Sequence, residues 1–140
     1  MTDFNKIFID TSPFIYLLED HETYGDLVAN FIQNCTKNGV LFTTSVITYE
    51  EFCVKPYELG RTEVIKAFEQ LLRELDIIPQ EITLLVADTA AKLRSKYHGL
   101  RSMDALQIST AIHTQCDKFI TNDKRLKQIQ EIEVILITGH

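Results

Sequence analysis

The 140-residue chain lacks several features that define other classes of protein. No stretch approaches the roughly 18 consecutive apolar residues of a membrane-spanning helix, and the polar residues 2–6 are not expected to belong to a signal peptide. The three cysteines, Cys35, Cys53 and Cys116, are far apart and odd in number. We therefore expect free thiols in a reducing cytoplasm. His113 and Cys116 have the spacing of half a zinc site, but no second pair completes it.

The sequence also lacks internal repeats, low-complexity segments and linkers rich in proline, glycine or serine. Its length and its hydrophobic fraction of 45% suit one domain with its own core, so we expect a single domain over residues 1–140. No Ser-His-Asp or Cys-His set is evident. Hydrolysis through an activated protein nucleophile is therefore not expected.

Short apolar strands alternate with helical segments, which predicts a parallel sheet with helices on both faces. The uninterrupted apolar run at residues 7–9 is typical of a central parallel strand. Further strands are predicted at residues 40–44, 76–79, 118–121 and 134–137. The third of the five strands is expected near an edge, because Pro79 removes a ladder donor. Helices are predicted at about 13–19, 22–37, 62–75, 81–97 and 102–116, and from residue 45 or 46 to a break marked by Pro56 and Gly60.

Four acidic residues stand at the ends of these strands or near the starts of these helices. Asp10 follows the first strand, and Asp123 closes the fourth. Glu51 lies on the helix after the second strand, and Asp104 opens the helix that Ser102 is expected to cap. A carboxylate beside a buried strand is costly unless something offsets its charge. Convergence of the four at one edge of the sheet predicts a site for Mg²⁺ or Mn²⁺.

Each of these acids also has an interpretation without metal. Asp104 stands where an acid favours a helix N-terminus. Asp123 could cap the turn that follows it. Glu50 competes with Glu51 for one role, although the spacing from Thr48 selects Glu51. Asp10 has the weakest alternative, since an acid that ends a fully apolar central strand needs a partner.

Four motifs resemble, in the same order, those of the PIN-domain family of metal-dependent ribonucleases, and within it the VapC-type toxins. The motifs are IFIDTS at residues 7–12, SVITYEEF at 45–52, SMDALQI at 102–108 and FITND at 119–123. The resemblance covers nearly the whole chain. It implies a three-layer α/β/α fold whose five parallel strands have the order 3-2-1-4-5. Ligands bind at the carboxyl ends of strands that flank such a switch point, where Asp10 and Asp123 stand.

The resemblance also implies an activity and its residues. Asp10, Glu51, Asp104 and Asp123 would be the catalytic residues and would hold Mg²⁺ or Mn²⁺ for hydrolysis of RNA to 5′-phosphate and 3′-hydroxyl ends. Supporting roles fall to Thr11, Ser12, Thr121 and Asn122. The implied partners are an RNA substrate, an antitoxin protein and a second copy of the chain, with Tyr16, Tyr49, Phe52 and Tyr57 as candidate interface aromatics.

The net charge of −6 argues against a nucleic-acid partner, but its distribution argues for one. Residues 92–127 carry eight basic and three acidic side chains, a balance of +5. Such a stretch beside the acids could hold a phosphate backbone, with Arg101, Lys124 and Arg125 as candidate RNA contacts. The alternative is that these charges are solvated helix faces.

Two other functions remain open at this point. A PIN-like domain can act as a non-catalytic RNA-binding module, which is disfavoured because all four acidic positions are filled. Phosphotransfer is disfavoured as well, because a haloacid dehalogenase-type phosphatase needs a second Asp where this chain has Ser12. A receiver domain needs a phosphoacceptor Asp at the end of the third strand, where this chain has Ile78 and Pro79.

Overall fold

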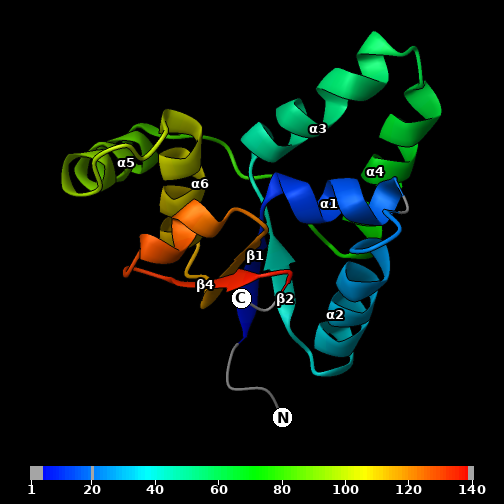
Figure 1. Ribbon diagram of the computed structural model, residues 1–140, viewed down its shortest axis with the longest axis horizontal. Coiled ribbons are helices and arrows are strands. Elements are labelled where there is room, and N and C mark those ends of the chain that lie inside the picture. Colours follow the sequence, from blue (N-terminus) through cyan, green and yellow to red (C-terminus); the bar gives the residue numbers. More distant parts are fainter. Residues whose placement is uncertain (1–4, 20, 139–140) are drawn as a thin grey trace.

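The computed structural model describes residues 5–19 and 21–138, which form one parallel sheet covered by helices (Figure 1). The strands are β1 (Lys6–Ile9), β2 (Leu41–Thr43), β3 (Lys118–Thr121) and β4 (Glu133–Leu136), in the order β2-β1-β3-β4. In the register of the central pair, Phe8 of β1 lies opposite Phe119 of β3. The prediction of an α/β fold with a parallel sheet is confirmed.

Six α-helices and one 3₁₀ helix are found in the described residues. They are α1 (Thr11–Leu18), α2 (Gly25–Lys37), α3 (Val46–Glu58), α4 (Thr62–Glu74), α5 (Leu84–Lys96), α6 (Ser102–His113) and the 3₁₀ helix η1 (Lys124–Gln128). Each predicted helix is present, with ends shifted by a few residues. The break predicted after α3 is confirmed, because the helix ends at Glu58, just before Gly60. Pro56 itself lies in the last turn of α3, where the loss of one backbone donor does not stop the helix. Among the described residues, no helix has the length and apolar character needed to cross a membrane.

The alternation of side chains along β1 divides the core between the two faces of the sheet. Ile7 and Ile9 pack with the buried side chains of α1, α2, α3 and α4. Phe8 faces the other way and packs with α5, α6 and η1, stacked on Phe119 at 5.0 Å between ring centroids. The two groups of helices stand on either side of the sheet in Figure 1, which is the three-layer arrangement that was expected.

The expected five strands in the order 3-2-1-4-5 are not observed, because residues 76–79 do not form a strand. Asp76 has a left-handed backbone with φ of 56°, and Pro79 has no N–H to donate. Only Gln80 reaches the sheet, through a single parallel bridge to Ser45 just beyond β2. The other four strands have the predicted order relative to one another.

The candidate interface aromatics have different surroundings. Phe52 is 3% exposed and packs against Phe68, so it is a core residue and not an interface residue. Tyr49 is half-buried and also lies against Phe68. Tyr57 is 63% exposed. Core packing therefore accounts for Phe52 and Tyr49, while Tyr57 is available at the surface.

Candidate active site

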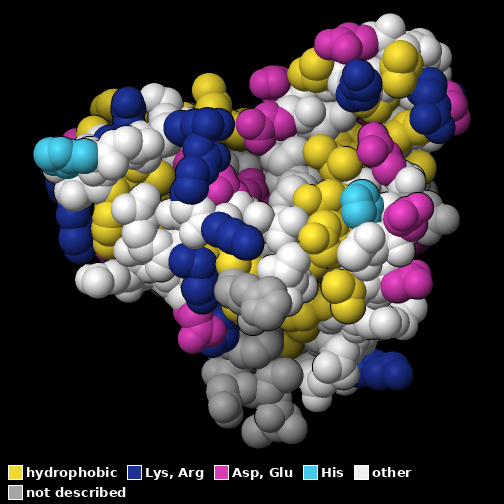
Figure 2. Space-filling model, in the orientation of Figure 1, with side chains coloured by type: hydrophobic (Ala, Val, Ile, Leu, Met, Phe, Trp, Pro, Cys, Tyr) yellow, Lys and Arg dark blue, Asp and Glu magenta, His cyan; other side chains and the backbone are white. Residues whose placement is uncertain are grey.

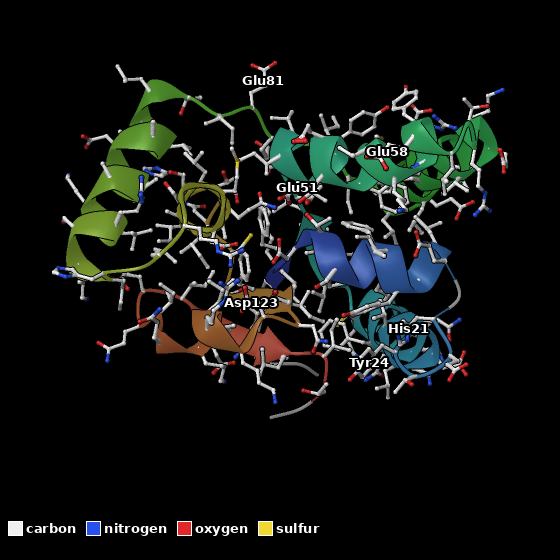
Figure 3. The ribbon with its side chains drawn as sticks, turned by 45° about the horizontal axis from the view of Figure 1, so that its top comes forward. His21, Tyr24, Glu51, Glu58, Glu81 and Asp123 are labelled. Carbon is white, nitrogen blue, oxygen red and sulfur yellow. The ribbon has the colours of Figure 1, made fainter. Side chains whose placement is uncertain are left out.

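The four predicted acids line one cavity at the carboxyl edge of the sheet, here called the acidic cavity, which encloses about 440 Å³. Asp10 follows β1, Asp123 follows β3, Asp104 lies in the first turn of α6 and Glu51 lies on α3. In Figure 3 the start of α1 lies between Glu51 and Asp123. The complete lining consists of Asp10, Thr11, Ser12, Ile15, Tyr16, Glu51, Arg101, Asp104, Thr121, Asn122, Asp123 and Arg125.

Asp10 is held by hydrogen-bond donors from three elements. The Thr121 hydroxyl donates to Oδ2 at 2.8 Å, while the Thr11 N–H and the Gln107 side-chain amide donate to Oδ1 at 2.8 and 3.3 Å. Burial outweighs these donors and raises the pKa of Asp10 to about 6, and the nearby charge of Asp104 acts in the same direction. The carboxylate is therefore positioned before any ligand binds, but its negative charge is poorly compensated.

Gln107 is a site residue that sequence reasoning missed. It is 1% exposed and lies one helical turn after Asp104 on α6. Its amide N–H donates to the Thr48 hydroxyl at 2.7 Å as well as to Asp10, and its carbonyl accepts from the Ser45 hydroxyl. A glutamine in the apolar run from Ala105 to Ile108 was the available signal, because a buried amide requires partners.

Asp104 is half-buried, and among the described residues it makes no hydrogen bond or ion pair. Its pKa is raised, first by burial and then by the charge of Asp123. The expected cap by Ser102 is wrong: Ser102 is the first residue of α6 and accepts from Arg94 at 2.8 Å, and α6 has no side-chain cap. Asp104 lies in the first turn of α6, so the interaction with the helix N-terminus that was weighed for it is present, and Arg125 and Arg101 attract it without forming an ion pair.

Asp123 is bound by Arg125 through both carboxylate oxygens. The guanidinium Nε and Nη2 donate at 2.9 and 2.5 Å, and the Arg125 backbone N–H donates at 3.0 Å. The last of these bonds caps η1, so the capping role weighed for Asp123 is present. The hydrogen bonds from Arg125 hold the pKa of Asp123 below its usual range.

Glu51 enters the cavity from the opposite side and accepts from the Thr11 hydroxyl at 2.7 Å. Its neighbour Glu50 is exposed and does not line the cavity. The structure thus brings Glu51, and not Glu50, next to the other three acids. Thr11 was expected to contact Asp10 or a phosphate, and it contacts Asp10 through its backbone and Glu51 through its side chain.

The remaining supporting residues join β3 to α1. The Thr121 hydroxyl donates to Asp10 and accepts from the Asp123 backbone N–H at 3.2 Å. The Ser12 hydroxyl accepts from the Asn122 backbone N–H at 3.2 Å, and the Asn122 amide donates to the Tyr16 hydroxyl at 3.1 Å. These contacts fix the relative position of the two strand ends that carry acids.

Lys and Arg side chains flank the acids in the hollow seen in Figure 2. Arg101 and Arg125 line the cavity, whereas Lys124 is exposed outside it. Most other cations of residues 92–127 are engaged elsewhere: Lys92 with Asp88, Lys96 with Glu131, Lys118 with Glu133, Lys127 with the Val134 carbonyl, and Arg94 with Leu100 and Ser102. Of the predicted RNA contacts, Arg101 and Arg125 therefore lie closest to the acids.

The donor set is chemically suited to a hard cation. All four acids offer carboxylate oxygens, which Mg²⁺ and Mn²⁺ prefer, and neither histidine nor cysteine lines the cavity. The unpartnered Asp104 and the poorly compensated Asp10 are the positions that a cation would relieve. In the part of the chain that the structure describes, no three acidic, histidine or cysteine side chains are close enough to share an ion as they are placed.

A family model described as the PIN domain matches residues 7–132. The chain belongs to the PIN domain family. The family prediction made from the four motifs is thereby confirmed. The comparison with curated proteins found no match.

Solved structures share the fold of this PIN domain. VapBC2 from Rickettsia felis, bound to a DNA fragment from its promoter, gives a TM-score of 0.77 at 16% identity, over 94% of this chain and 98% of that one. A toxin–antitoxin complex from Klebsiella pneumoniae gives 0.68 at 19% identity, over 94% and 97%. VapC20 from Mycobacterium tuberculosis, described as a Sarcin-Ricin loop cleaving toxin, gives 0.67 at 12% identity, over 91% and 98%. These neighbours agree with the VapC-type resemblance.

Proposed function

We propose that this PIN domain is a Mg²⁺- or Mn²⁺-dependent endoribonuclease and the toxin of a toxin–antitoxin pair. The observation that carries the proposal is the acidic cavity, where four acids from separate segments of the chain meet beside two arginines. Such a cluster has a cost in the folded protein, visible in the raised pKa values of Asp10 and Asp104. A function that needs the cluster explains why that cost is tolerated.

Each side chain has a proposed role. Asp10, Asp104, Asp123 and Glu51 would hold the ion, and Thr121 and Gln107 orient Asp10 through their hydrogen bonds. When bound, the ion would lower the pKa of a water molecule and polarise the phosphodiester. No protein nucleophile is required, since the lining of the cavity offers no Ser-His or Cys-His pair.

Arg101 and Arg125 are the proposed contacts to the RNA backbone. Arg101 immediately precedes α6, and in the described residues its side chain makes no hydrogen bond or ion pair, so it can bind a phosphate directly. Arg125 can bind a phosphate when it releases Asp123. Lys124 directly precedes Arg125 in the sequence but lies outside the cavity, so it would only attract the RNA at long range.

The proposed partners follow from the neighbours and from the surface. VapBC2 and the Klebsiella pneumoniae protein were solved as toxin–antitoxin complexes, and by analogy this chain would bind an antitoxin and act in the cytoplasm. Pairing as a homodimer belongs to the same proposal, with Tyr57 as an available surface aromatic. Sedimentation at micromolar concentration tests the dimer, because a species of only 16.1 kDa would remove it.

Metal binding can be tested without RNA. Millimolar Mn²⁺ is expected to raise the melting temperature relative to EDTA, because a cation relieves the repulsion among the acids. Asp104→Asn should reduce the gain, since the part of the chain that the structure describes gives Asp104 no hydrogen bond or ion pair, only the longer-range attraction of Arg125 and Arg101. Equal melting temperatures in Mn²⁺ and EDTA would remove the metal site.

Cleavage is tested with a matched pair of neighbouring glutamates. Purified protein with Mn²⁺ should cut RNA internally, and EDTA should stop it. Glu51→Gln should slow cleavage strongly, whereas Glu50→Gln removes the same charge outside the cavity and should leave the rate within about twofold. Equal loss in both variants would mean that Glu51 acts only through the charge of α3.

The contact between Arg125 and Asp123 favours one alternative, a non-catalytic RNA-binding module. An arginine that holds both oxygens of Asp123 can replace a cation permanently. The two functions predict opposite results in the same assay. Tight RNA binding that is insensitive to Mn²⁺, with no cleavage of any RNA, would support the module and remove the nuclease.

A further inference from the structure

Three aromatic rings stand together at the turn between α1 and α2. Tyr16 comes from α1, His21 from the turn and Tyr24 from the residue before α2. Their ring centroids are 4.8 Å apart for Tyr16 and His21, 5.1 Å for Tyr16 and Tyr24, and 5.0 Å for His21 and Tyr24. His21 and Tyr24 are nearly parallel, at 9°, and they lie beside each other in Figure 3.

The backbone of the turn holds the rings in place. His21 Nδ1 accepts from the backbone N–H groups of Thr23 and Tyr24, each at 3.1 Å. The His21 N–H donates to the Tyr16 carbonyl at 2.9 Å, and the Gly25 N–H donates to the His21 carbonyl at 2.9 Å. The His21 side chain is nevertheless exposed, and Tyr16 and Tyr24 are half-buried. A fixed and accessible aromatic face loses little entropy when a flat ligand stacks on it.

The rings are continuous with the acidic cavity. Tyr16 is part of its lining, and the Tyr16 hydroxyl accepts from Asn122, the residue between Thr121 and Asp123. A ligand that lies across the carboxylates can therefore contact Tyr16, and Tyr16 in turn lies against His21 and Tyr24, which stand outside the lining. Phe14 is the buried aromatic of α1, whereas Tyr16 packs against the core with only part of its side chain and stays partly accessible.

The charges around the rings indicate which part of a nucleic acid would lie there. Glu19 and Glu22 are exposed on the same turn, so a phosphate would be repelled. Arg101 immediately precedes α6 and Arg125 lies in η1, and both line the cavity. In Figure 1, α6 stands on the other side of β1 from α1. The cavity thus has cations for the backbone on one side, and on the side of α1 it has Tyr16, which lies against the other two rings.

We propose that Tyr16, His21 and Tyr24 form a stacking subsite for one unpaired nucleobase of single-stranded RNA whose backbone crosses the acidic cavity. Nucleobases stack on aromatic side chains irrespective of sequence, so the subsite selects unpaired RNA over duplex RNA. This inference rests on the proposed function, since it assigns RNA to the same cavity.

The first test locates the base. Single-stranded RNA with 5-iodouracil at one position at a time is irradiated with the wild-type protein in EDTA, so that cleavage is stopped. One position should crosslink to a peptide that contains Tyr16, His21 or Tyr24. Crosslinks only to other peptides would overturn the subsite.

The second test measures the stacking by fluorescence anisotropy. Tyr24→Leu and His21→Leu should each raise the Kd of the RNA about fivefold or more, and Tyr24→Phe should retain wild-type affinity. Leu84→Ala, which shortens an apolar side chain that is 88% exposed on α5 and outside the cavity, should change Kd by less than about twofold. Equal losses for Leu84→Ala and Tyr24→Leu would overturn the subsite.

An abasic nucleotide at the crosslinked position completes a double-mutant cycle. The wild type should lose affinity for the abasic RNA, and Tyr24→Leu should lose no more. Additive losses would mean that the base binds elsewhere.

The subsite and the nuclease function can fail separately. RNA that crosslinks to these rings but is never cut would contradict the proposed nuclease function and leave the subsite standing. If the protein cuts RNA but both leucine variants bind RNA with the wild-type Kd, the subsite is contradicted and the nuclease function stands.

Discussion

At the floor of the acidic cavity, formed by Asp10, Gln107 and Thr121, a carboxylate is surrounded by donors of the folded chain. At its rim, formed by Asp123 and Arg125, a carboxylate is bound by one guanidinium that is 54% exposed. Burial raises the pKa of Asp10, whereas Arg125 lowers that of Asp123. The floor therefore keeps its geometry whatever binds, and the rim can exchange one cation for another.

Among the substitutions that test this difference between floor and rim, Asp10→Asn is expected to have the largest effect, and the effect is on cleavage. Cleavage should fall on the order of 1,000-fold or more, because the substitution removes metal affinity at the most rigid position. RNA binding should stay the same or become tighter, since a negative charge is lost. Initial rates and anisotropy on the same RNA provide the two readouts. Cleavage at the wild-type rate would show that the activity comes from another site or a contaminant.

The stability of the floor should depend on pH with a definite sign. The pKa of Asp10 is about 6 in the folded protein and lower when unfolded, so the folded state binds the proton more tightly. The stability gained from protonation is complete at low pH and is lost as pH rises through about 6. In EDTA, the stability of Asp10→Asn relative to wild type should therefore increase by about 2 kcal/mol from pH 4 to 7.5. Urea denaturation checks this, and a constant difference would contradict it.

Gln107→Leu should lower the stability of the protein, because it removes the hydrogen bonds that Gln107 makes at the floor of the cavity. The substitution removes the acceptor of the buried Ser45 hydroxyl, which keeps only the Ile47 N–H, and the donor to the buried Thr48 hydroxyl, so it should cost about 1–3 kcal/mol in the free energy of unfolding. Gln70→Leu on the exposed face of α4 is the control and should stay within about 0.5 kcal/mol. Similar small losses in both variants would show that the network contributes little.

The smallest expected effect is at the rim. Arg125→Ala should tighten Mn²⁺ binding about threefold or more, because Asp123 is released from its bidentate partner. Lys124→Ala removes a neighbouring charge that does not contact Asp123 and should have less effect. Isothermal titration with Mn²⁺ compares the two variants. Equal changes would mean that only net charge matters at the rim.

Much of the fold was predictable because its signals are local. The uninterrupted run from Ile7 to Ile9 identified the central strand, and the helical spacing of apolar residues located the helices to within a few residues. The prediction of a strand at residues 76–79 was wrong, because a short apolar run does not indicate whether a neighbouring strand can pair with it. The left-handed Asp76 and the missing donor of Pro79 prevent pairing there.

The candidate site likewise has features that the sequence predicted and features that it did not. The sequence by itself determined which acids end strands or open helices, and the resemblance to the PIN-domain family implied the strand order in which Asp10 and Asp123 meet at a switch point. Only the tertiary structure decided their partners. Gln107 reaches Asp10 from 97 residues away, and Thr121 from 111. Periodicity and caps depend on neighbours in the chain, whereas hydrogen-bond partners and pKa values depend on which distant side chains the packed core brings into contact.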